Sequence, residues 1–117
     1  MSFDLVVWAL GQGATSTDVR AAHERCRQGD HAAGEPVRRI SSFYRAVTTE
    51  YPDRPGPNSP WEVAPLHVAR DHVEMRLDEG CADEVLLAIE RLAAEHGLLL
   101  LDPQDGSVYP PPAPVTG

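Results

Sequence analysis

The first apolar segment, residues 3–10, is hydrophobic at both odd and even positions. A strand that is apolar on both faces is buried on both sides, so this pattern predicts a central strand of a sheet. Two amphipathic helices are expected next, over residues 15–27 and 37–51, because apolar side chains recur there at helical spacing. Thr15 is a suitable N-cap for the first of these helices, and Pro52 ends the second.

Residues 61–79 alternate between apolar and polar positions in the manner of a β-hairpin. A turn at residues 70–71 pairs His67 with Glu74 and makes one face wholly apolar, whereas a shift of one residue would mix the two faces. The apolar face carries Ala64, Leu66, Val68, Val73, Met75 and Leu77. The pattern therefore predicts the register of the hairpin as well as its existence.

A third helix is expected over residues 81–96, with Gly97 as its C-terminal stop, followed by an apolar strand over 98–101 and a short extended segment over 107–109. The expected order is β-α-α-β-β-α-β. With right-handed crossovers, this order folds as an α+β domain with a ferredoxin-like antiparallel sheet and an extra helix in the first crossover. We expect the helices to cover one face of this sheet and to leave the other face open.

The chain has 117 residues, 42% of them hydrophobic, which is enough for one domain, assigned to residues 1–109. The proline-rich residues 110–117 are expected to be a disordered tail, and the four prolines of residues 52–60 predict a loop. No run of apolar residues is long enough to cross a membrane and no basic leader is present, so a cytoplasmic location is expected. Cys26 and Cys81 are then expected to be free thiols.

The formal net charge is -8, and all ten basic residues are arginines. This acidity argues against nucleic acid as a partner and is compatible with a basic protein partner. Gly11 and Gly13 follow a strand, but the third glycine of a dinucleotide-binding loop is missing and the chain has no lysine for a phosphate loop. No catalytic nucleophile is evident, and no cofactor is expected.

Two groups of residues suggest chemistry. His67 and Glu74 face each other on the open side of the sheet, and either form an acid/base pair or contribute a plain exposed cross-strand contact. His23, Cys26 and His31 include donors that zinc prefers, but a fourth ligand is missing. We interpret Cys26 as a buried helix residue beside surface histidines, and no metal is expected.

The two tryptophans, Trp8 and Trp61, are read either as core aromatics or as contacts to a partner, where tryptophan is over-represented. Val6, Trp8 and Leu10 would leave an apolar strip on the open face. Its possible covers are the proline loop, the C-terminal tail, a second copy of the chain or a partner protein.

Four different short motifs stand out, namely residues 2–8 (SFDLVVW), 59–61 (SPW), 94–98 (AEHGL) and 101–104 (LDPQ). With these motifs the chain resembles a small bacterial, actinobacterial-type protein family over most of its length. Some members accompany secreted toxin systems, so the resemblance implies an immunity-like protein; it supplies no catalytic residues. The sequence departs from the family pattern at residues 78–79, where an aromatic-polar pair is expected.

The leading functional hypothesis is a non-enzymatic protein-binding module, in its most concrete form an immunity protein that neutralises a basic toxin. The alternative is a small enzyme or ligand-binding protein, built as a dimeric α+β barrel around a pocket lined by histidine and glutamate. No nucleic acid or membrane partner is expected, and no residue is assigned a catalytic role. The candidate partner-binding residues are Trp8, Trp61, His67, Asp71, His72, Glu74, Arg76, Asp78 and Glu79.

Overall fold

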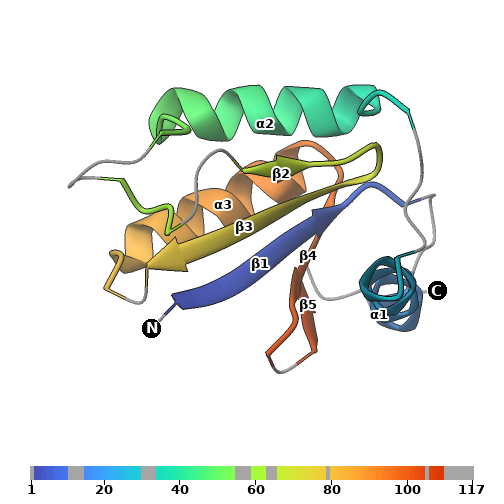
Figure 1. Cartoon of the computed structure of the whole chain (residues 1–117). Helices are drawn as coiled ribbons and strands as arrows, with labels where there is room; N and C mark the ends of the chain where they lie inside the picture. Colours follow the sequence, from blue (N-terminus) through green and yellow to red (C-terminus); the bar gives the residue numbers. More distant parts are fainter. Residues whose placement is uncertain are drawn as a thin grey trace, which may run out of the picture.

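Five antiparallel strands form one sheet, and three helices pack on it, within the part of the chain that the structure describes (Figure 1). The strands are β1 (Ser2–Trp8), β2 (His67–Val68), β3 (His72–Asp78), β4 (Leu99–Asp102) and β5 (Ser107–Tyr109). The helices are α1 (Ser16–Arg27), α2 (Arg38–Glu50) and α3 (Asp83–Glu95). The structure is a computed structural model and describes residues 2–10, 15–29, 34–54, 59–62, 66–78, 80–104 and 106–109. The α+β class is as predicted; the first seven elements follow the predicted order, and residues 107–109, expected as a short extended segment, add the strand β5.

Some predictions lie outside the described residues. They concern Gly11 and Gly13, His31, Glu79, the middle of the proline loop, and the tail from residue 110. None of the described helices combines the length and the apolar character that crossing a membrane requires.

The strand order is β2-β3-β1-β4-β5, so β1 is central, as its two apolar faces predict. β1 pairs along its whole length with β3, from Ser2 opposite Asp78 to Trp8 opposite His72. The predicted hairpin register is confirmed, because residue 67 lies opposite residue 74 and residue 68 opposite residue 73. β2 is only two residues long, which is shorter than expected, and Trp61 makes an isolated bridge to β3 farther along.

Helices α2 and α3 cover the first face of the sheet and build the main core with it. The stripe predicted for α2 is confirmed, since Ile40, Phe43 and Val47 are all fully buried. Arg39 fixes this layer at one end: its guanidinium donates to the carbonyl of Gly97 at 2.7 Å and to that of Leu10 at 2.9 Å. The described part of the apolar face predicted for the hairpin belongs to this core, while Ala64 lies outside the described residues.

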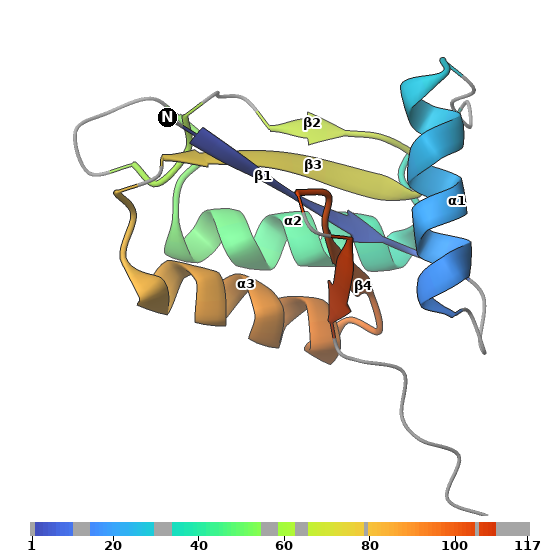
Figure 2. The ribbon, with the colours of Figure 1, turned by 90° about the horizontal axis from the view of Figure 1, so that it is seen from below.

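Helix α1 packs on the second face of the sheet, opposite α2 and α3 (Figure 1). It lies at the end of the sheet where β1 stops and β3 begins (Figure 2). The expectation that all helices cover one face is therefore wrong. The reason is that the second face of β1 is apolar too and has to be buried. The cluster formed there consists of Val6, Trp8, Val19, Ala22, Cys26, Leu101 and Val108.

Two local contacts fix α1. Thr15 caps the helix as predicted, because its hydroxyl accepts from the amide of Asp18 while the Asp18 carboxylate accepts from the amide of Thr15 at 2.8 Å. The hydrogen bond from the Thr15 backbone holds the pKa of Asp18 below its ordinary value. Arg20 donates to the carbonyl of Gly106 at 3.0 Å, which ties the helix to the turn between β4 and β5.

Candidate functional site

His72 is the one buried charged or polar side chain of the described core, with 1% of its surface exposed. Its ring stacks on the indole of Trp8, with centroids 4.3 Å apart. Its Nδ1 lies 2.9 Å from Oδ1 of Asp71, and its Nε2 lies 3.5 Å from Sγ of Cys26. Because a carboxylate only accepts, this hydrogen bond requires a proton on Nδ1 of His72. The other ring nitrogen, Nε2, faces the sulfur of Cys26.

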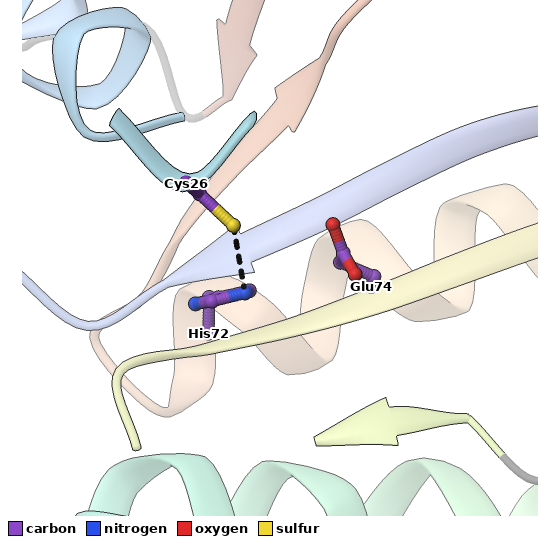
Figure 3. Close-up of side chains that lie close together, drawn as sticks. All are labelled: Cys26, His72 and Glu74. Carbon is purple, nitrogen blue, oxygen red and sulfur yellow. Dashed lines mark hydrogen bonds between the residues drawn. The ribbon is translucent and has the colours of Figure 1, made fainter. Parts of the chain in front are cut away.

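Glu74 completes a group that we call the Cys–His–Glu cluster, consisting of Cys26, His72 and Glu74. One ligand atom from each residue lies within 4.8 Å of the other two. His72 and Glu74 are two positions apart on β3 and therefore share a face, while Cys26 comes down from α1 (Figure 3). The sequence pattern places Cys26 near His23 and His31. In the fold, Cys26 lies close to His72 and Glu74 of β3.

The thiol of Cys26 lacks the environment of a catalytic nucleophile. Burial raises the pKa of this thiol, and the carboxylates of Glu74 and Asp71 raise it further. Reactive cysteines need the opposite, a lowered pKa that populates the thiolate. Cys26, His72 and Asp71 are therefore arranged in space like a nucleophile, a base and an orienting carboxylate. The raised pKa of the thiol, however, does not favour the thiolate that such a triad needs.

A pocket with a volume of about 540 Å³ lies beside the cluster, and we call it the polar pocket. Its charged and titratable lining comes from β1, α1, β2 and β3, namely Asp4, His23, Arg27, His67, Glu74 and Arg76. The β4–β5 turn closes one side with Pro103 and Gln104. Glu74 belongs to both the pocket and the Cys–His–Glu cluster, so the two features adjoin.

Two ion pairs lie in this lining. Nε of Arg76 donates to Oδ1 of Asp4 at 2.9 Å, which fixes the guanidinium across the β1–β3 pair. Nε2 of His67 lies 3.8 Å from Oε2 of Glu74, with 58% and 42% of these side chains exposed. The predicted His67–Glu74 pair is therefore present, at a distance typical of a loose ion pair rather than a hydrogen bond.

His23 extends from α1 into the pocket and was not assigned there from the sequence. Its Nδ1 is buried with no hydrogen-bond partner, and its ring meets Trp8 edge-on at 6.4 Å. Burial lowers the pKa of His23 and favours the neutral ring. Asp4 and Arg27 were missed as well. A signal for His23 existed, because it precedes Cys26 by one helical turn.

Glu79 lies outside the described residues, and the other eight predicted partner-binding residues divide into two groups. The side chains of Trp8, Trp61 and His72 are buried to 95% or more. The two indoles belong to the core clusters, and His72 lies beneath α1, so these three side chains offer little surface to a partner. The exposed or half-exposed residues are His67, Asp71, Glu74, Arg76 and Asp78. Among the predicted residues that the structure describes, this second group has surface to offer a partner.

Comparison with known proteins adds no assignment for these residues. The chain matches no protein-family model, and no curated protein or solved structure is significantly similar to it. The function is therefore argued from the side chains themselves.

Proposed function

We propose that the chain is a binding domain whose polar pocket takes a small molecule with both acidic and basic groups. The observation that carries this proposal is the pocket itself. Its volume of about 540 Å³ falls within the range of about 300–1,000 Å³ that small-molecule sites occupy. The described lining draws on β1, α1, β2 and β3 of one chain, and α1 covers the end of the sheet face near Trp8.

The charges of the lining define the ligand class. The guanidinium groups of Arg27 and Arg76 are suited to a carboxylate or phosphate, since their planar donors match two oxygens at once. Glu74 offers an acceptor to an ammonium group. Val6 and Leu66 contribute apolar surface for the carbon atoms between these groups. A zwitterionic molecule of the size of an amino acid or a short peptide fits this distribution.

Binding is favoured over catalysis. Proton transfer by His72 would require the ligand to reach a side chain that is 1% exposed. His67 with Glu74 can accept a proton, but a single acid/base pair without a nucleophile or electrophile supports recognition more directly than a reaction.

A protein partner remains the leading expectation from the sequence, with an immunity role implied by the resemblance. Interfaces between proteins usually centre on exposed aromatic or large apolar anchors. Among the described residues, the exposed large hydrophobic side chain is Leu87, on a helix that covers the opposite face of the sheet. The polar pocket therefore supports a small ligand better than a protein.

The test is a titration of the isotope-labelled full chain with amino acids, dipeptides and phosphorylated metabolites, followed by backbone nuclear magnetic resonance. A ligand of the proposed class should give saturable shifts at His67, Glu74 and Arg76. Glu74→Gln and Arg76→Gln should each weaken binding about 10-fold, or about 1.4 kcal/mol. Glu90→Gln and Arg45→Gln are the matched controls, because both side chains are exposed on helices of the other face.

The controls should bind as the unaltered chain does. The proposal fails if no compound in the panel gives saturable shifts, or if the two pocket variants bind as tightly as the two controls.

We also infer that β2-β3-β1-β4, with α2 and α3, is a ferredoxin-like unit to which α1 and β5 are added. The support is the order of these strands and their antiparallel pairing.

A further inference from the structure

The Cys–His–Glu cluster gathers three different donor atoms at one point of the fold. Sulfur, imidazole nitrogen and carboxylate oxygen are the ligand types that zinc takes in proteins, whereas magnesium and calcium prefer oxygen alone. The three atoms lie within 4.8 Å of one another, and they come from elements that are far apart in the sequence. This mixture of sulfur, nitrogen and oxygen donors favours zinc over magnesium or calcium.

The spacing of two of these atoms already matches a tetrahedral site. With zinc–sulfur and zinc–nitrogen bonds of about 2.3 and 2.0 Å, tetrahedral angles separate the two ligand atoms by roughly 3.5 Å. Sγ of Cys26 and Nε2 of His72 are 3.5 Å apart (Figure 3). Glu74 is half-exposed, so its side chain has room to change rotamer when an ion binds.

The surroundings of His72 are those of a metal ligand. Histidines that bind zinc almost always donate their other ring nitrogen to a carboxylate or carbonyl, which fixes the ring and the tautomer. Asp71 occupies this position at 2.9 Å from Nδ1. The stacked indole of Trp8 holds the ring plane as well, so Nε2 keeps one direction.

The charge and the access of the cluster also fit an ion. Zinc binding releases the proton of the Cys26 thiol, and the resulting thiolate together with the Glu74 carboxylate neutralises the two positive charges of the ion. Three protein ligands leave one position of a tetrahedral ion for water or a ligand atom. Since Glu74 also lines the polar pocket, that position is expected to face the pocket.

We propose that Cys26, His72 and Glu74 bind one Zn²⁺ ion per chain, with Asp71 as the residue that positions His72. The two proposals share Glu74, so zinc binding is measured without an organic ligand and the titration with organic ligands is carried out on the metal-free chain.

The test uses the full chain, freed of metal by a chelator, with Zn²⁺ and Co²⁺ as probes. Zinc should bind with a stoichiometry of one, measured by competition with a chromophoric chelator and by elemental analysis. Cobalt should give the near-ultraviolet absorption of a sulfur ligand. Cys26→Ser and Glu74→Gln should each lower the affinity for zinc by roughly 100-fold or more, and Asp71→Asn by about 10-fold. Magnesium should not compete.

Two variants serve as controls. Cys81→Ser removes the other cysteine, which lies outside the cluster, and should leave zinc affinity and the cobalt absorption unchanged. Glu74→Gln alters a half-exposed side chain and is expected to stay folded, so it keeps the test valid if Cys26→Ser unfolds. The proposal is overturned if the unaltered chain binds no stoichiometric zinc, if Glu74→Gln binds it equally tightly, or if the cobalt absorption depends on Cys81.

Discussion

Single polar residues hold the loops of this chain in place. Asp53, near the start of the proline loop, accepts hydrogen bonds from the hydroxyl of Tyr44 and from the amide of Leu66 at 2.9 Å. One carboxylate thereby joins α2 to the chain that enters β2. The hydrogen bond to Asp53 raises the pKa of Tyr44 to about 12, with burial as a second cause.

Replacing Tyr44 by phenylalanine tests this bond. A hydrogen bond to a charged group contributes about 1.5–3 kcal/mol when it is shielded, and a half-exposed one contributes less, about 1 kcal/mol. Tyr44→Phe should lower the free energy of unfolding in urea by that amount at neutral pH.

The bond also predicts a dependence on pH. The folded chain holds the Tyr44 proton more tightly than the unfolded chain, so the stabilisation is complete below pH 10 and is lost as the pH rises from 10 toward about 12. An ultraviolet titration of tyrosinate should show one tyrosine near 12 that disappears in Tyr44→Phe. Its persistence in that variant would assign the high pKa to another tyrosine and refute the account of Asp53.

At the scale of elements, the placement of α1 decides what the sheet can do. The helix covers Trp8 and His72, brings Cys26 over β3 and supplies His23 and Arg27 to the polar pocket. Without α1 on this face, neither the cluster nor the pocket would be complete. The packing of α1 should therefore be coupled to the environment of Trp8.

Val19 offers a direct test, since it is fully buried between α1 and the second face. Val19→Ala removes two methyl groups and should destabilise the chain by about 1–2 kcal/mol. In a Trp61→Phe background, the fluorescence of Trp8 should also become easier to quench with acrylamide. Thr17→Ala, an exposed position on the same helix, is the control. Equal quenching of Trp8 in the Val19→Ala and control chains would show that α1 does not shield this indole.

At the scale of the whole molecule, the two faces of the sheet differ in polarity. The face under α2 and α3 forms the larger core, with residues such as Phe43 and Met75 fully buried. The face under α1 changes along its length, from apolar at Trp8 to charged at Asp4 and Arg76. The core secures the fold, and the second face is free to carry polar chemistry.

Local patterns predicted most of this fold. The alternation of apolar and polar residues in the hairpin predicted the pairing of His67 with Glu74. The two apolar faces of β1 predicted its central position in the sheet. These patterns do not predict which face of the sheet a helix packs on. The apolar stripe of α1 shows that one side of the helix is buried, but not which face of the sheet receives it.

The same limit applies to the candidate site. The apolar strip around Trp8 indicates that the second face needs a cover, but the pattern does not identify α1 as that cover. Cys26 and His72 are 46 positions apart, so their contact depends entirely on where α1 packs. His67 and Glu74 could be found from the sequence because they lie in one hairpin, whose register is local information.

The central claim is that the face beneath α1 carries a binding centre at Cys26, His72 and Glu74. X-ray absorption at the zinc edge, on the full chain with one equivalent of Zn²⁺, tests it most directly. The account predicts one sulfur neighbour at about 2.3 Å, with the remaining nitrogen and oxygen neighbours at about 2.0–2.2 Å. In Cys26→Ser the sulfur neighbour should disappear. A zinc shell of nitrogen and oxygen alone in the unaltered chain would contradict the claim.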